Sequence, residues 1–206
     1  MGEVDVGRPE GFRLREIPEA YLLVREKIRE LLAGDRPRIL AAIDGRCGSG
    51  KTTLAAWLME QFDGNLFHMD DFYLREEQRT PERLAEDGGN VDYERFREEV
   101  TDPLTSGREV LYRRFDCGSF SLQDPERIPR KRLNVIEGSY SMHPYFGDIY
   151  DLRVFMTVSK EEQRERIRKR TGEEKLQRFL GEWIPKEEAY FRKFHPEQGA
   201  LVISGE

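Results

Sequence analysis

The sequence has few cysteines, no long apolar run and no excess of positive charge. Its two cysteines, Cys47 and Cys117, are too few for a disulfide framework and are typical of a reducing compartment. No stretch approaches the roughly 18 consecutive apolar residues of a membrane-spanning helix, and the first residues do not resemble a secretion signal. We therefore expect a cytoplasmic protein with no membrane partner.

The charge of the chain is negative overall, with a formal net charge of −6. A negative chain does not attract nucleic acid as a whole molecule, so we expect no nucleic-acid partner. Of its 206 residues 37% are hydrophobic, which is enough for one buried core, and neither a repeat nor a low-complexity tract is present. The length predicts a single domain over residues 1–206, with residues 1–36 as an N-terminal helical extension.

Short apolar runs alternate with segments of helical periodicity along the chain. Strands are predicted at 38–44, 65–70, 132–137, 152–158 and 200–204, and helices at 18–33, after residue 52 as far as Phe62, and at 92–104, 160–170 and 173–194. Strands separated by helices form parallel sheets covered on both faces. The pattern therefore predicts one α/β domain.

The most specific motif is Gly45–Thr52, which reads G-R-C-G-S-G-K-T and matches the phosphate-binding pattern G-x-x-x-x-G-K-[ST]. It lies between a predicted strand and a predicted helix, where the backbone N–H groups and the helix N-terminus can surround a phosphate. Lys51 is expected to reach the β- and γ-phosphates of ATP, and the Thr52 hydroxyl to hold Mg²⁺. The predicted nucleotide-binding residues are Gly45, Arg46, Cys47, Gly48, Ser49, Gly50, Lys51, Thr52 and Thr53.

Acidic residues follow two further strands. The segment His68–Tyr73 (H-M-D-D-F-Y) places Asp70 or Asp71 at the carboxyl edge of the sheet, where ligands bind in open α/β folds. A carboxylate there can accept a hydroxyl proton or help to hold the metal, although two aspartates can also cap a turn. Glu137, at the end of another strand, is a candidate metal ligand through water.

A basic segment, Q-R-E-R-I-R-K-R, occupies residues 163–170. Its arginines can neutralise the charge that develops during phosphoryl transfer, or they can form a solvated helix face with Glu–Arg pairs.

Other residues also have two interpretations. Cys47 lies inside the phosphate loop, where a thiol is either redox-sensitive or simply a small side chain. Tyr140 and His143 either border an acceptor pocket or pack under a loop. The aromatic residues 183, 190, 191 and 194 are expected to form a core stripe.

Four features occur together in this chain: I-D-G-x-x-G-S-G-K-T-T-L-A, H-M-D-D-F-Y, I-E-G-S-Y and the basic helix. Together they resemble the uridine kinase and phosphoribulokinase family of P-loop kinases. Nicotinamide riboside kinase and type I pantothenate kinase belong to the same broad group. The resemblance covers about residues 39–205. It implies a P-loop NTPase fold with a five-stranded parallel sheet in the order 2-3-1-4-5, and a helical lid at about 160–185. It also implies ATP and Mg²⁺ as cofactors, and it allows a homo-oligomer.

The same resemblance implies roles for individual residues. Asp70 matches the catalytic base, and Arg166 and Arg170 match lid arginines that act with Lys51 in transfer. Residues expected at the acceptor are Asp71, Tyr73, Asp92, Tyr112, Arg114 and Tyr140. Those expected at the metal are Thr52, Asp70 and Glu137.

The segment Val110–Phe120 departs from the uridine kinase pattern, because it lacks the histidine that follows P-x-Y-D-F in that family. Arg113, Arg114 and Asp116 favour a more polar acceptor, and an anionic one is a hypothesis. We therefore expect an ATP-dependent kinase of a nucleoside-like hydroxyl acceptor. The alternatives are nicotinamide riboside, pantothenate or a phosphosugar as acceptor, or a P-loop ATPase or nucleotide switch.

Overall fold

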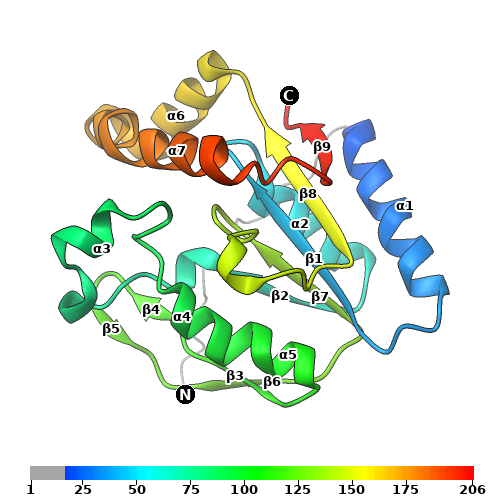
Figure 1. Cartoon of the computed structure of the whole chain (residues 1–206). Coiled ribbons are helices and arrows are strands. Elements are labelled where there is room, and N and C mark those ends of the chain that lie inside the picture. Colours follow the sequence, from blue (N-terminus) through cyan, green and yellow to red (C-terminus); the bar gives the residue numbers. More distant parts are fainter. Residues whose placement is uncertain (1–16) are drawn as a thin grey trace, which may run out of the picture.

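A five-stranded parallel sheet forms the centre of the molecule in the computed structural model, which describes residues 17–206. Its strands are β1 (Ile39–Gly45), β2 (Gly64–His68), β7 (Leu133–Glu137), β8 (Leu152–Thr157) and β9 (Leu201–Ser204), in the order β2-β7-β1-β8-β9 (Figure 1). Numbered along the chain, these five strands have the order 2-3-1-4-5, as predicted. Every residue of β1 is buried, because the strand is apolar and lies in the middle of a covered sheet.

One face of the sheet packs against α1 (Glu19–Ala33) and α2 (Lys51–Gln61). Successive side chains of a strand point to opposite faces, and Ile39, Ala41 and Ile43 of β1 contribute to this side of the core. The N-terminal extension predicted at 1–36 contains a helix at Glu19–Ala33. Residues 1–16 of this extension lie outside the described part of the chain.

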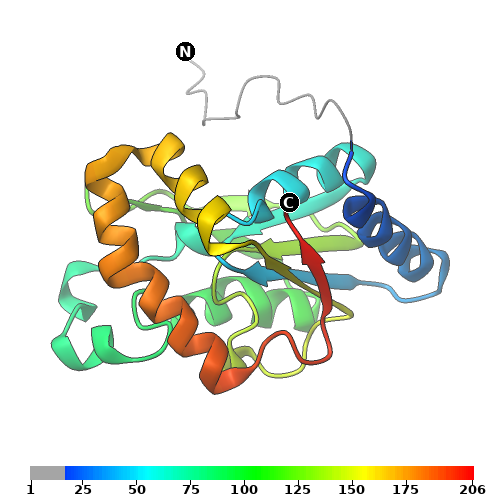
Figure 2. The same ribbon diagram turned by 90° about the horizontal axis from the view of Figure 1, so that it is seen from above.

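The other face is covered by α4 (Tyr93–Phe96), a π-helical turn at Arg97–Thr101, α5 (Asp102–Ser106) and part of α7 (Ile184–Phe194). Leu40, Ile136 and Phe155 point to this side. The helix predicted at 92–104 is therefore interrupted by a wider turn. Figure 2 shows α2 and the α4–α5 segment on opposite sides of the sheet.

The segment after α5 forms two small antiparallel ladders that the sequence did not predict. They pair β3 (Val110–Tyr112) with β6 (Glu126–Ile128) and β4 (Phe115–Asp116) with β5 (Ser121–Leu122). Their strands are two or three residues long and have no apolar alternation that would reveal them. Other short elements are α3 (Pro81–Ala85) and the 3₁₀ turns Met69–Asp71, Glu76–Gln78 and Pro144–Phe146.

The C-terminal helices arch past the carboxyl end of the sheet (Figure 2). They are α6 (Lys160–Arg178), a π-helical turn at Phe179–Trp183, and α7 (Ile184–Phe194). Gly172, with φ 82° and ψ 170°, kinks α6 between the two helices that were predicted there. In the part of the chain from residue 17 onward, no helix has the length and apolar character needed to cross a membrane.

Candidate functional site

The loop Gly45–Thr52 joins β1 to α2 and presents the N-terminus of that helix. Gly45 has φ 127°, and a Cβ built on it would lie 2.0 Å from the Met156 carbonyl oxygen, so no other residue fits beside β8. Gly50 has φ 99° and immediately precedes the helix, which begins at Lys51. The glycines therefore allow the chain to turn back on itself, and the turn leaves backbone N–H groups available for an anion.

Lys51 is folded over this loop. Its Nζ donates to the carbonyl oxygens of Gly45 at 2.7 Å and Arg46 at 2.9 Å, and it lies 3.4 Å from the Ser139 hydroxyl. Only 8% of the residue is exposed. The ammonium group is thus held at the loop by groups that a phosphate oxygen can replace.

A series of polar contacts begins at the end of the loop and joins Thr52, Glu137 and His68. The Thr52 hydroxyl lies 3.2 and 3.3 Å from the two Glu137 carboxylate oxygens, and His68 Nδ1 lies 2.6 Å from Oε1. A hydroxyl and a carboxylate are hard oxygen donors, which suit Mg²⁺. Burial lowers the pKa of His68, but the hydrogen bond and charge of Glu137 outweigh it and raise the pKa above its ordinary value.

Asp70 and Asp71 follow β2 and have different surroundings. Tyr112 donates to the Asp71 carboxylate at 2.7 Å, and Arg114 Nε lies 3.7 Å from it. The Asp70 carboxylate is accessible to solvent, and the Tyr73 hydroxyl is near enough to lower the pKa of this carboxyl. Protein groups nevertheless surround it. The resulting desolvation is the larger cause that raises the pKa of Asp70, and the negative charge of Glu137 is the second. Asp70 is the better placed of the two to accept a proton from a ligand.

Proteins similar to this chain are known from both sequence and structure. No protein-family model matches the sequence. Over 118 residues the chain is 26% identical to uridine-cytidine kinase C of Dictyostelium discoideum, a match that covers 56% of this chain but only 26% of that protein. The chain therefore spans about a quarter of the length of this curated relative.

Two solved structures superpose over most of the chain. A possible uridine kinase from Bacillus stearothermophilus has a TM-score of 0.71 and 19% identity, with 90% of this chain and 97% of that chain covered. A candidate fructose transport system kinase from Silicibacter sp. TM1040 has a TM-score of 0.68 and 21% identity, with the same coverage. The chain has the fold of the uridine kinase-like P-loop proteins. The sequence motifs and the Dictyostelium relative support the same family.

Within this uridine kinase-like fold, the predicted acceptor residues are mostly engaged with the protein. Asp92 is 1% exposed and caps α4 by accepting from the Arg95 N–H at 3.1 Å. The Tyr112 hydroxyl also accepts from the His68 N–H at 3.1 Å, and Tyr140 is 5% exposed and packs edge-on against Tyr190.

The arginines next to Tyr112 also have protein partners. Arg113 Nε donates to Glu99 at 2.9 Å, and Arg114 lies between Asp71 and Glu126. Asp116 accepts from the Gly118 N–H at 2.7 Å within its own turn. Among these residues, Arg114 is the one placed beside Asp71, and its role in acceptor binding stays a prediction.

The two lid arginines differ in position. Arg166 donates to Glu162 at 2.7 Å, to the Gly48 carbonyl at 3.2 Å and to the Gly205 carbonyl at 2.8 Å, so it anchors α6 to the phosphate loop. Arg170 is exposed, lies over the Phe179 ring at 5.9 Å, and is close enough to Cys47 for its charge to act on that thiol. Of the two, Arg170 has the freer side chain.

Glu187 of α7 is a site residue that the sequence analysis missed. Its Oε2 accepts from the Cys47 N–H at 3.0 Å, and its Oε1 accepts from the Ser139 hydroxyl at 2.5 Å. The residue is 5% exposed. A carboxylate of the chain thus binds a phosphate-loop donor, in the manner of an anionic ligand. The next residue, Glu188, forms a bidentate pair with Arg46 at 2.8 and 3.2 Å.

Cys47 and Asp44 show how strongly the loop is desolvated. Burial is the larger cause that raises the pKa of the Cys47 thiol, and the charge of Glu187 is the second. A raised pKa argues against a reactive thiolate, so Cys47 is better interpreted as a small side chain in the loop. Burial raises the pKa of Asp44 to about 6, although hydrogen bonds from Met142, Gly45 and Tyr190 oppose it. Asp44 ties the start of the loop to the segment after β7 and to α7.

Proposed function

We propose that the chain is an ATP- and Mg²⁺-dependent kinase that transfers the γ-phosphate to a hydroxyl group of a small molecule. The observation that carries the proposal is the position of Asp70. It is an accessible carboxylate with a raised pKa, close enough to Lys51 and Glu137 for their charges to act on it. In this proposal a proton acceptor, a phosphate loop and a metal-binding pair act together at the carboxyl edge of one sheet.

The residues of the loop would bind and orient the nucleotide. Lys51 would exchange its carbonyl partners for phosphate oxygens, and the N–H groups of the loop would hold the phosphates. Thr52 and Glu137 would hold Mg²⁺, which neutralises phosphate charge when it is bound. Because Glu137 is also the partner of His68, we expect metal binding to weaken that contact.

Asp70 would orient the acceptor hydroxyl and take its proton as the oxygen attacks phosphorus. A raised pKa makes a carboxylate a better proton acceptor near neutral pH. The Tyr73 hydroxyl lies near Asp70. Burial is the larger cause that raises the pKa of Tyr73 and the charge of Asp70 is the second, so the phenol stays protonated. Tyr73 would therefore fix the orientation of the base.

The helices α6 and α7 would exclude water from the transfer. Arg166 joins α6 to the loop, Glu187 joins α7 to it, and Arg170 extends from the kink region with no carboxylate partner in the described part of the chain. Arg170 is the arginine that can approach the γ-phosphate, where it would stabilise the charge that develops.

The acceptor class is the part of the proposal that needs direct measurement. The experiment measures ADP release from ATP·Mg²⁺ with nucleosides, nicotinamide riboside, pantothenate and phosphosugars, together with a control without acceptor. Release that depends on one acceptor class supports the kinase and names its substrate. Release that depends only on ATP contradicts transfer to these acceptors and favours a P-loop ATPase.

A further inference from the structure

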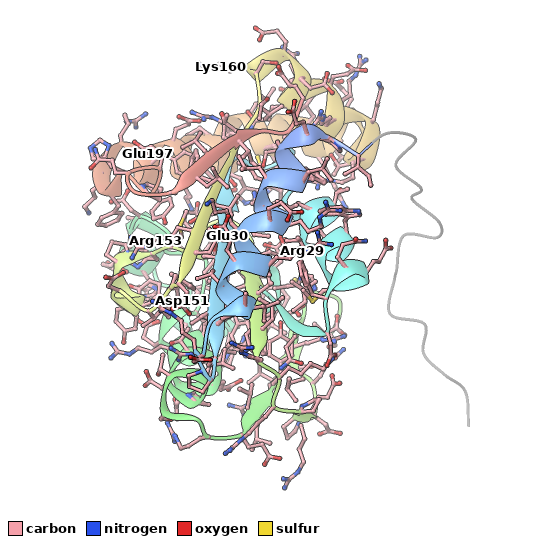
Figure 3. The ribbon with its side chains drawn as sticks, turned by 90° about the vertical axis from the view of Figure 1, so that its right-hand side faces the viewer. Arg29, Glu30, Asp151, Arg153, Lys160 and Glu197 are labelled. Carbon is pink, nitrogen blue, oxygen red and sulfur yellow. The ribbon has the colours of Figure 1, made fainter. Side chains whose placement is uncertain are left out.

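A second group of cations lies at the opposite end of the sheet from the phosphate loop. A cavity of about 550 Å³ opens there, where β1, β2 and β7 begin, with Asn65 and Asn134 among its lining residues. We call it the basic cleft, after the cations that line it: Arg36, Arg38, Arg108, Arg130 and Lys131. Figure 3 shows Asp151, which also lines it, at the other end of β8 from Lys160.

The acids near the basic cleft do not balance these cations. Asp151, the one acid among the described residues of the lining, is paired with Arg36 and accepts from the Leu40 N–H at 2.9 Å. Lys131 lies 2.7 Å from Asp63, an exposed carboxylate outside the lining. Among the residues that the structure describes, Arg36 and Lys131 of the lining are paired with a carboxylate and the other three cations are not, which leaves a local excess of positive charge in a chain whose formal net charge is −6.

Arg38 and Arg130 supply most of this excess. Within residues 17–206 neither guanidinium forms a hydrogen bond or an ion pair, and Arg38 Nη1 is buried without a partner. Burying a charged donor without a partner is unfavourable, because the donor loses its hydrogen bonds to water. By contrast, the nearby Arg132 has protein partners for its guanidinium group, since it donates to the carbonyl oxygens of Arg36, Leu32 and Gly34. The donors of Arg38 and Arg130 remain available for a ligand.

We propose that the basic cleft binds a small phosphate-bearing anion, at a site separate from the phosphate loop. The planar fork of arginine matches phosphate oxygens, and several arginines around one cavity favour a group that carries two or more negative charges. The volume lies within the range of about 300–1,000 Å³ that is typical of small-molecule sites. Pyrophosphate, a nucleotide or a sugar phosphate shares this chemistry.

The test uses inorganic pyrophosphate and the full chain carrying Lys51→Ala, which weakens phosphate binding at the loop. Calorimetry measures its affinity, and NMR follows the side-chain amides of Asn65 and Asn134. We expect these amide signals to shift. We also expect Arg38→Gln together with Arg130→Gln to weaken binding by about 10-fold or more, since two charge-assisted contacts are lost.

The matched control is Lys27→Gln together with Arg29→Gln on α1, which removes the same charge from an exposed helix face and should change affinity by less than about 2-fold. Arg130→Gln alone, at the exposed rim, keeps the test valid if Arg38→Gln impairs folding. Pyrophosphate that leaves both asparagine amides unchanged, or that binds the Arg130→Gln chain as tightly, would overturn the proposal.

Further titrations with a nucleoside monophosphate and a sugar monophosphate identify the preferred carrier of the phosphate. These results are independent of the proposed kinase activity, because they measure binding in a chain whose phosphate loop is already impaired.

Discussion

Glu187 gives the sharpest prediction, because its carboxylate binds a donor that the proposed nucleotide needs. Glu187→Gln keeps the shape of the side chain and removes its charge. Glu187 accepts from the Cys47 N–H at 3.0 Å and from the Ser139 hydroxyl at 2.5 Å, and Ser139 in turn lies 3.4 Å from Lys51 Nζ. An incoming phosphate must therefore displace a carboxylate that is already bonded to the loop.

The magnitude follows from two effects. A hydrogen bond to a charged group contributes about 1.5–3 kcal/mol and a neutral one about 0.5–1.5 kcal/mol, so the amide of Gln holds the loop more weakly by about 1 kcal/mol. A carboxylate that remains about 4 Å from a phosphate charge adds repulsion of up to about 4 kcal/mol near a protein surface. We expect ATP to bind the Glu187→Gln chain at least about 10-fold more tightly, which corresponds to about 1.4 kcal/mol.

The assay is calorimetric titration of ATP without acceptor, at one fixed salt concentration. Glu182→Gln is the matched control, since it removes the same charge from the preceding turn, where Glu182 pairs with Arg178 and Lys186. Its affinity for ATP should stay within about 2-fold of the wild type. Equal or weaker ATP binding by Glu187→Gln would refute the idea that this carboxylate competes with phosphate.

Three further variants test other contacts. Lys51→Ala should weaken ATP binding and remove transfer, because the ammonium that holds the phosphates is lost; calorimetry that shows wild-type affinity would contradict this role. Tyr73→Phe removes the hydroxyl group that lowers the pKa of Asp70. The base must be unprotonated, so activity is lost as the pH falls through this raised pKa, and the acid limb of kcat/KM should move to higher pH in Tyr73→Phe; an unmoved limb would argue against Asp70 as the base. Tyr190→Phe removes a buried hydrogen bond of 2.9 Å to Asp44 and should lower the free energy of unfolding by about 1.5–3 kcal/mol in urea titrations, whereas a loss below about 0.5 kcal/mol would mean that the bond contributes little.

The five strands and the phosphate loop could be predicted because their signals are local. Each strand is a short apolar run between turn-forming residues, and the parallel direction follows from the helices between them, whereas the order 2-3-1-4-5 was implied by the family resemblance. The structure shifts most boundaries by one or two residues, as at β2, where Met69–Asp71 form a 3₁₀ turn instead of the end of a strand.

The missed features depend on contacts between distant parts of the chain. Glu187 meets Cys47 across 140 residues, and nothing in the local sequence of α7 distinguishes it from the other glutamates there. The predictions for Asp71 and Asp92 met a similar limit, because motifs indicate which acids lie near a site but not which ones the protein itself binds. The strands between 110 and 128 are stabilised by pairing rather than by an apolar pattern.

The most direct test of the proposed kinase is ³¹P NMR of the products formed from ATP·Mg²⁺ and the acceptor found in the panel, with wild-type chain and with Asp70→Asn. We predict a new phosphomonoester signal for the wild type. We predict a rate lower by about 10²–10⁴-fold for Asp70→Asn, with ATP affinity unchanged, because the variant loses only the proton acceptor. Inorganic phosphate as the only product of the wild type, or an Asp70→Asn chain that forms the ester at the wild-type rate, would contradict the account.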